Sequence, residues 1–316
     1  MSGHVVALCG GVGGAKLAYG LAQILSPDDL TIVVNTGDDF VHLGLHVAPD
    51  IDTVVYTLAG LSDRERGWGL AGETWNFMAA MRRLGAEAWF NLGDRDLAMH
   101  VERTRRLAAG QALCEVTADL AAALDIRALI VPMSDDPVRT IVATADGDLA
   151  FQRYFVGEQC RPVATAIRFE GAGAARPTEA FRAALARPDL AAVIVCPSNP
   201  YLSIDPILAV PGVRAALEAA AAPFVAVSPI IGGEALKGPA AKLMRELGVE
   251  PSVRAVADHY RGLLDALVID HADAAHADAL GVPALVTQAI MTTDQDRRRL
   301  AQETLDLALS LGRARK

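Results

Sequence analysis

The sequence lacks several features that would place it in well-defined classes of protein. It has only four cysteines in 316 residues, with no paired spacing, and two of them, Cys9 and Cys196, lie inside apolar, strand-like runs. We therefore expect buried, reduced thiols. No apolar run is long enough to span a bilayer, and no basic-then-apolar leader is visible. These absences predict a cytoplasmic protein with no membrane partner.

A surplus of positive charge is missing as well. The chain carries 38 acidic and 29 basic side chains, a formal charge of −9, which argues against nucleic acid as the main partner. A phosphorylated substrate would need local compensation from backbone N–H groups, arginines or a metal. No repeat, low-complexity segment or linker interrupts the chain. With 52% apolar residues, residues 1–316 are predicted to form a single α/β domain.

Apolar strand-like runs alternate with helical patterns along the chain. A strand at 5–9 is followed by the glycine-rich residues 10–14, a helical pattern at 15–25 and a second strand at 30–34. This order predicts a Rossmann-like, doubly wound, mostly parallel sheet. Further strands are expected at 88–92, 128–132, 191–196, 224–227, 267–270 and 284–288.

One segment departs from this alternation. Asp146 and Gly147 separate two apolar runs, 138–144 and 149–156, and Asp-Gly supplies the positive φ of a tight hairpin turn. The run at 164–169 is expected to pair with the hairpin. Together they predict a small mixed α+β, β-rich insertion at about residues 139–175.

Acidic side chains gather after the second predicted strand. Asp38 and Asp39 follow it directly, and Asp50 and Asp52 come shortly afterwards. Ligands of open α/β sheets lie beyond the carboxyl ends of the strands, and carboxylates beside phosphates often hold Mg²⁺. The alternative for each acid alone is a helix cap, a turn or a solvated loop. As a set, the four predict a metal and phosphate site.

The glycine-rich residues 10–14 follow a strand and open a helix, where backbone N–H groups and the helix dipole favour a phosphate. Gly11, Gly13, Gly14 and Lys16 are the candidates for phosphate contact. The pattern is neither a dinucleotide fingerprint nor a Walker A loop, because the third glycine position holds Lys16 and no Ser or Thr follows. The alternative is a tight packing turn with a solvated lysine.

Polar residues follow other strands too. Ser198 and Asn199 come after the strand at 191–196 and offer a hydroxyl and an amide to a nucleotide. Arg95 is positioned to clamp a phosphate that Asp94 orients. Taken alone, Ser198 and Asn199 indicate no more than ordinary turn chemistry. A local ion pair explains Asp94 and Arg95 equally well. Glycines, acids and polar loop ends together suit phosphoryl transfer, in which positioning and charge neutralisation dominate.

Eight segments in this order resemble the 2-phospho-L-lactate transferase family of deazaflavin coenzyme biosynthesis, including its phosphoenolpyruvate-using bacterial members. The segments are Gly10-Gly-Val-Gly-Gly-Ala-Lys16, Asn35-Thr-Gly-Asp-Asp39, Pro49-Asp-Ile-Asp-Thr53, Arg66-Gly-Trp-Gly69, Leu92-Gly-Asp-Arg-Asp96, Pro132-Met-Ser-Asp-Asp-Pro137, Pro197-Ser-Asn-Pro200 and Ser228-Pro-Ile-Ile-Gly232. Each is weak alone, but the set is specific and extends to about residue 270.

The resemblance implies a reaction. Members of the family join a phospho-three-carbon acid, carried by a guanosine-diphosphate-linked donor, to the hydroxyl of the deazariboflavin Fo. They use Mg²⁺ and release GMP, which leads to coenzyme F-420. The acid would be phospholactate, phosphoenolpyruvate or phosphoglycerate, and a homodimer is a family-level expectation.

The resemblance also implies roles for residues. Asp38 and Asp52 would hold Mg²⁺, and Asp52 or Asp50 would accept the proton of the Fo hydroxyl. Asn91 would lie near Fo, while the glycine segment, Ser198 and Asn199 would hold the guanosine diphosphate end. The alternatives are a relative of the same fold that binds a sugar nucleotide without this chemistry, and a non-catalytic nucleotide-binding regulator.

Overall fold

The computed structural model describes residues 3–312, which are built around a seven-stranded sheet in which every strand pair is parallel. The strand order is β14-β13-β10-β9-β1-β2-β5. These strands are β1 (His4–Cys9), β2 (Leu30–Val34), β5 (Leu129–Pro132), β9 (Leu190–Val195), β10 (Phe224–Val227), β13 (Ala266–Asp270) and β14 (Ala284–Thr287). The predicted Rossmann-like α/β fold is therefore confirmed.

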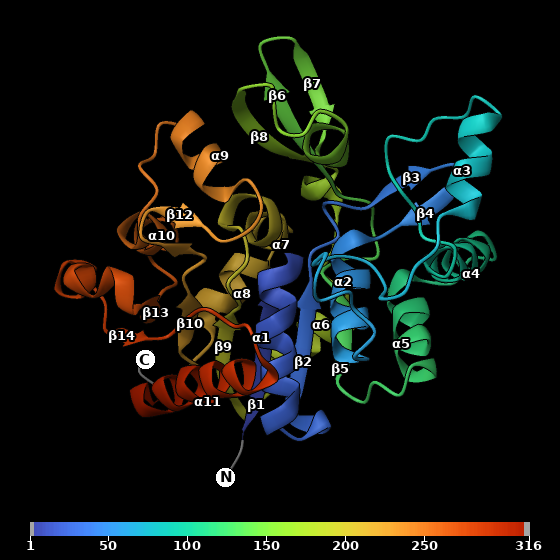
Figure 1. Ribbon diagram of the computed structural model, residues 1–316. Coiled ribbons are helices and arrows are strands. Elements are labelled where there is room, and N and C mark those ends of the chain that lie inside the picture. Colours follow the sequence, from blue (N-terminus) through green and yellow to red (C-terminus); the bar gives the residue numbers. More distant parts are fainter. Residues whose placement is uncertain (1–2, 313–316) are drawn as a thin grey trace.

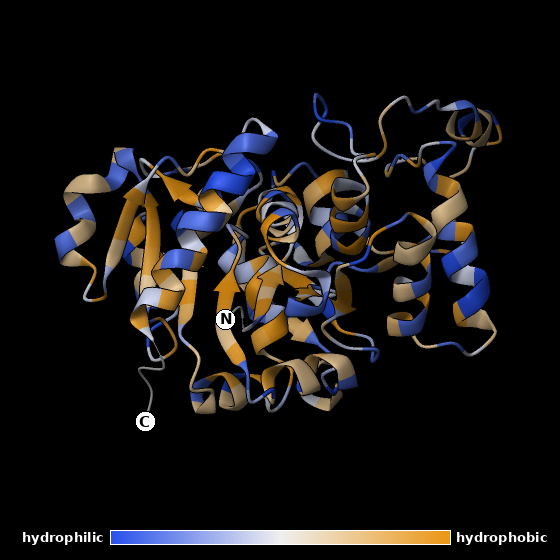
Figure 2. Ribbon diagram, turned by 90° about the horizontal axis from the view of Figure 1, so that it is seen from below, coloured by the Kyte–Doolittle hydropathy of each residue, from blue (hydrophilic) through white to orange (hydrophobic). Residues whose placement is uncertain are grey.

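Both faces of the sheet are covered, because buried strand residues alternate between two cores. On β1, Val6 and Leu8 face one core, whereas Val5, Ala7 and Cys9 face the other. The first core contains α6 (Glu179–Leu185), α8 (Val213–Ala219), α9 (Ala240–Glu246) and α10 (Val253–His259); the second contains α1 (Gly11–Ile24), α2 (Pro49–Leu58), α5 (Leu113–Ala123) and α11 (Asp294–Leu311). Figure 2 shows the strands in hydrophobic colours between helices with more hydrophilic outer sides.

The strand order reverses beside β1. From β1 the chain passes to β2 and β5 on one side, and it later returns to β9 on the other. In parallel sheets a crevice forms at the carboxyl ends of the two strands that flank such a reversal. The segments that follow β1 and β9 are the glycine-rich residues and Pro197-Ser198-Asn199. The fold thus brings two predicted site segments, 188 residues apart at Gly10 and Ser198, into direct contact.

Three smaller parts stand on this edge of the sheet (Figure 1). One is the antiparallel hairpin β3 (Phe40–His42) and β4 (Leu45–Val47) with α3 (Asn76–Arg83) and α4 (Asp96–Ala108). The second is the three-stranded sheet of β6 (Arg139–Thr144), β7 (Gly147–Ala150) and β8 (Ala164–Glu170), which contains the expected Asp-Gly hairpin. The third is α9 with the short strands β11 (Ile230–Ile231) and β12 (Glu234–Ala235).

The remaining elements are short. They are α7 (Asp205–Leu208), the 3-10 helices at Pro27–Asp29, Ala172–Ala174 and His271–Ala279, and the π-helical turns at Arg153–Gly157 and Pro200–Ile204. No helix within residues 3–312 has the length and apolar character needed to cross a membrane.

Three expectations about local structure are wrong. The segment 88–92 is not a strand, because Trp89 and Phe90 pack with Phe40 and His42 instead of pairing with the sheet. The hairpin's second strand ends at Ala150, after which the chain turns helical. Residues 11–14 are not a loop but the first turn of α1.

Candidate active site at the strand-order reversal

Three glycines, Gly10, Gly13 and Gly14, bring the start of α1 against its neighbours in the crevice. A Cβ on Gly13 would lie 2.4 Å from the carbonyl oxygen of Pro197, and one on Gly14 would lie 2.5 Å from Ser198 Oγ. Gly10 is equally crowded, whereas Gly11, with φ +66°, faces open space. The glycines therefore allow close packing beneath the crevice, and only Gly11 leaves room for a ligand to approach the backbone.

The N-terminus of α1 already meets two side chains. Gly11 N–H donates to Asp50 Oδ1 at 2.7 Å, and Gly10 N–H donates to Ser198 Oγ at 3.1 Å. The next N–H groups of the first helical turn have no partner within the helix. Lys16, one turn further on, donates to the carbonyl oxygen of Met291 at 2.8 Å.

Asn35 links the acids to the other side of the crevice. Its Nδ2 donates to Asp50 Oδ2 at 2.9 Å and to the Leu202 carbonyl oxygen at 3.3 Å, and its Oδ1 accepts Gly37 N–H at 2.8 Å. The side-chain amide of Asn35 thus joins three segments: the turn after β2, the first turn of α2 and the turn after β9. The predicted grouping of acids beside the glycine segment is thus observed for Asp50.

Asp38 and Asp39 are buried, and His46 Nε2 lies 3.8 Å from Asp39 Oδ2. Oδ1 of Asp38 and both carboxylate oxygens of Asp39 are buried without a hydrogen bond. Burial, and next the charge of Asp50, raise the pKa of Asp38 well above its ordinary value. Burial also raises the pKa of Asp39, against the opposing charges of Arg103 and Arg139. Burial raises the pKa of Asp50 to about 6.

A divalent cation fits these orphaned oxygens. Burial raises the pKa values of all three acids, and the charge of Asp50 raises those of Asp38 and Asp39 further. A bound cation would supply the missing positive charge. No cluster of three or more His, Cys, Asp or Glu side chains is arranged as a ready-made metal cage anywhere in residues 3–312. Mg²⁺ suits such an incomplete set, because it keeps waters and substrate phosphates in its coordination shell.

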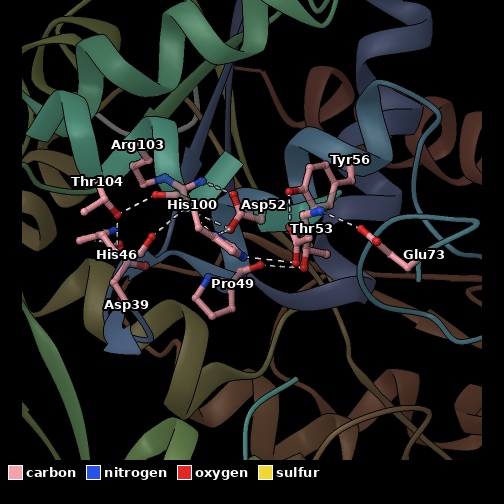
Figure 3. A network of polar contacts seen from close by, with 11 residues as sticks. Asp39, His46, Pro49, Asp52, Thr53, Tyr56, Glu73, His100, Arg103 and Thr104 are labelled. Atoms are coloured by element: carbon pink, nitrogen blue, oxygen red, sulfur yellow. Dashed lines mark hydrogen bonds and ion pairs between the residues drawn. The ribbon is translucent and has the colours of Figure 1, made fainter. Parts of the chain in front are cut away.

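Asp52 has a different environment from the other acids (Figure 3). Its carboxylate pairs with Arg103 through both guanidinium nitrogens, with 3.2 Å between Oδ2 and Nη1. His100 Nδ1 lies 3.6 Å from Oδ2. Asp52 and Arg103 are 5% and 1% exposed. Arg103 would compete with a metal ion for the carboxylate oxygens of Asp52. The role of Asp52 as a metal ligand therefore stays a prediction.

The network extends from Asp52 to α4. His100 Nε2 lies 3.2 Å from Asp96 Oδ2, and Tyr56 donates its hydroxyl hydrogen to Asp96 Oδ1. Glu73 accepts the N–H of Asp96 at 2.7 Å at the start of α4 (Figure 3). Sequence reasoning missed Tyr56, His100 and Arg103 as parts of the site. The spacing of His100 and Arg103 on one helical face was the only available signal.

The remaining predicted residues fall into two groups. Asn199 lies in the crevice, where its Oδ1 accepts Tyr201 N–H at 3.0 Å and its buried Nδ2 has no partner. Asn91 and Arg95 are exposed, and Arg95 meets the network only through its backbone N–H, which donates to Glu73 at 2.9 Å. Asn91 accepts from Arg82, and Arg95 Nη1 donates to the Ala71 carbonyl oxygen at 2.9 Å.

Asp94 and the acids after β5 have structural partners. Asp94 accepts the N–H of Asn76 at 3.0 Å and of Phe77 at 2.9 Å, so it begins α3 and makes no ion pair with Arg95. Asp135 accepts Cys114 N–H at 2.7 Å and Asp136 accepts Arg176 N–H at 2.9 Å. For both segments the structure supports a turn or cap.

Comparison with known proteins gives matches over nearly the whole chain. The family model 2-phospho-L-lactate transferase CofD matches residues 5–307. A phosphoenolpyruvate transferase of Kitasatospora aureofaciens is 41% identical over 315 residues, covering 96% of this chain and 98% of that protein. A 2-phospho-L-lactate transferase of Methanosarcina acetivorans is 39% identical over 306 residues, with the same coverage.

A solved structure shows the same fold. It is a member of the UPF0052 family from Bacillus halodurans, with a TM-score of 0.64 and 14% identity, covering 96% of this chain and 99% of that one. At this identity the likeness concerns the fold alone. The sequence matches go further, because they extend over nearly the whole chain at about 40% identity. The chain therefore belongs to the 2-phospho-L-lactate transferase family of enzymes.

Proposed function

We propose that the protein transfers a phospho-three-carbon-acid group from a guanosine-diphosphate-linked donor to the hydroxyl of the deazaflavin Fo. GMP is released, and the product is a precursor of coenzyme F-420. The group is 2-phospholactyl, enolpyruvyl phosphate or phosphoglyceryl. The names of the relatives support the reaction class. The observation that carries the proposal is the set of buried carboxylate oxygens of Asp38 and Asp39 that accept no hydrogen bond, beside Asp50 and the N-terminus of α1.

We assign the metal to Asp38, whose free oxygen is the best-suited ligand among the predicted pair. When bound, Mg²⁺ would offset the charge of the donor phosphates and hold them for in-line attack. Asp52 remains the second predicted ligand, but its contact with Arg103 would have to be shared. While that contact holds, Asp52 stabilises the first turn of α2, which carries Asp50.

Asp50 is the better of the two predicted bases. Its pKa of about 6 lies near neutral pH, where a general base is most effective. The Fo hydroxyl oxygen would form a bond to the phosphorus that bears the three-carbon acid, while its proton passes to Asp50. The phosphoanhydride bond to GMP breaks, and GMP leaves with the electron pair. Gly11, Gly13 and Gly14, through the first turn of α1, with Lys16, Ser198 and Asn199 would hold the donor.

The test is incubation with Fo, Mg²⁺ and each of the three candidate donors, followed by measurement of product mass and of GMP. We expect one donor to give a phosphodiester of Fo and one GMP per product. Binding of Fo, measured by its own fluorescence, serves as the control for an intact acceptor site. Fo binding with no product from any donor would contradict the proposal and favour a non-catalytic relative of the same fold.

A further inference from the structure

A small hollow lies beside the crevice, between the two helices that carry the site. It has a volume of about 60 Å³. Its walls come from the start of α1, the middle of α2, the loop at residues 62–69 and the start of α11. The basic residues that line it are Lys16, Arg64, Lys237 and Arg297. Only Lys16 among them is predicted to meet the donor.

The hollow carries more positive than negative charge. Asp294 is shared between Arg64, at 3.0 Å, and Arg297, at 3.2 Å. Asp63 also lines the hollow, but it pairs with Arg66 at 2.7 Å. In the part of the chain that the structure describes, Lys16 and Lys237 make no ion pair with a carboxylate. Four cations therefore face the hollow with one shared counter-charge.

The cations are held close together by the fold. Burial lowers the pKa of Lys16, and the charges of Arg297 and Lys237 lower it further. Arg297 is 4% exposed, and its Nε is buried without a hydrogen-bond partner. Gly67, which has φ +82°, lies directly against Lys237 Nζ, so this loop brings the lysine to the hollow. Crowded, incompletely paired cations around a hollow are the arrangement expected of an anion site.

We propose that this hollow binds an oxyanion of the donor, either its second phosphate or the carboxylate of its three-carbon acid, through Lys237, Arg297 and Lys16. The inference rests on the proposed function and adds the residues that hold the reacting end. Lys16 lies on the same helix as Gly11, and Thr53 in the wall follows Asp50 on α2. An anion in the hollow would thus lie next to the acids that we assign to the metal and the proton.

The test replaces Lys237, which has no structural ion pair. We expect Lys237→Ala to weaken binding of the anionic group by roughly tenfold or more, as for the loss of a charge-assisted hydrogen bond. Lys237→Arg should restore part of the loss. Arg83→Ala is the matched control, because it removes one positive charge from an exposed side chain on α3 that makes no ion pair within the described residues. Circular dichroism and thermal melting confirm that each variant is folded.

Two measurements distinguish the second phosphate from the carboxylate as the bound anion. They are calorimetry with GDP and with GMP, and the KM for the complete donor. Weaker GDP binding with unchanged GMP binding would place the second phosphate in the hollow. Unchanged GDP binding with a raised KM for the donor would place the carboxylate there. If Lys237→Ala has the wild-type affinity for GDP, the wild-type affinity for GMP and the wild-type KM for the donor, the inference is wrong. Turnover by that variant would still support the proposed function. Absence of turnover by the wild-type protein with every donor would instead count against the proposed function.

Discussion

The carboxylate of Asp50 caps helix α1 from outside, by accepting the N–H of Gly11 at 2.7 Å. An acid from the first turn of α2 thus occupies the position at which a phosphate would meet the helix dipole. Asp50 is held there by Asn35 as well. The negative charge nearest to the helix therefore belongs to the protein itself, and a donor phosphate must be accommodated beside it.

The raised pKa of Asp50 predicts how stability depends on pH. In the unfolded chain this carboxyl ionises near 3.8, whereas in the folded protein its pKa is about 6. Between these values the folded state binds more protons, so the free energy of unfolding falls as pH rises from about 4 to about 6. A difference of about two pKa units corresponds to about 3 kcal/mol.

Urea unfolding without Mg²⁺ at a series of pH values between 4 and 7 measures this slope. Asp50→Asn should remove part of the slope of the unfolding free energy against pH. The slope that remains should come from Asp38 and Asp39, because their pKa values are raised as well. Protons compete with a cation for these oxygens, so the affinity for Mg²⁺ should rise over the same range. An Asp50→Asn protein with the full wild-type slope would show that Asp50 titrates normally.

Replacement of Asp38 should separate activity from stability. Asp38→Asn removes the predicted metal ligand, and we expect turnover to fall by about a hundredfold or more, since a catalytic metal supplies several kcal/mol. The thermal midpoint should stay the same or rise, because repulsion with Asp50 is relieved. Asp146→Asn, in the exposed hairpin turn, is the matched control. Near-normal Mg²⁺-dependent turnover of Asp38→Asn would remove Asp38 from the mechanism.

The buried pair of Asp52 and Arg103 should be coupled in stability. Arg103→Met removes the guanidinium that pairs with the buried Asp52 carboxylate, and we expect a loss of about 3–5 kcal/mol in the free energy of unfolding. The double variant with Asp52→Leu should lose less than the single changes added together. Denaturant unfolding of the four proteins in the cycle measures the coupling. A loss below about 1 kcal/mol in Arg103→Met would show that the pair contributes little.

Asn199 allows a test of the donor contact. Its Oδ1 accepts the N–H groups of Tyr201 and Leu202, whereas its Nδ2 is free. Asn199→Asp keeps the accepting oxygen and replaces the free donor by an anionic oxygen. We expect GDP binding weakened by roughly tenfold or more, and a lower melting temperature because the new carboxylate oxygen is buried. Asn199→Ala should lower stability by about 1 kcal/mol through loss of the cap. Equal GDP binding by Asn199→Asp and the wild type would exclude Asn199 from the donor site.

The sheet was predictable because its strands are short, continuous apolar runs rich in Val and Ile, which only a doubly covered parallel sheet buries. The same rule failed at residues 88–92. Trp89 and Phe90 are apolar, but they pack on Phe40 and His42, and Arg153 from the β6–β8 region lies over Trp89. Periodicity in one segment carries no information about such contacts between distant segments.

In the site as well, some contacts were predictable from the sequence and others were not. Asp50 beside Gly11 and Ser198 beside Gly10 were predictable, because parallel strands end at one edge. The pairing of Asp52 with Arg103 was not, because it joins two helices 51 positions apart in sequence. Nor did the sequence indicate that Lys237 would lie against Gly67. The Mg²⁺ ion, the donor and the homodimer stay predictions.

The contact between Gly13 and the Pro197 carbonyl has a mechanical consequence. With no room even for a methyl group between α1 and the segment after β9, the base of the crevice is a fixed wall. The movement that would admit the tricyclic acceptor proposed above, and then shut out water, would come from the rim, where the β3–β4 hairpin, the β6–β8 sheet and α9 stand over that wall (Figure 1).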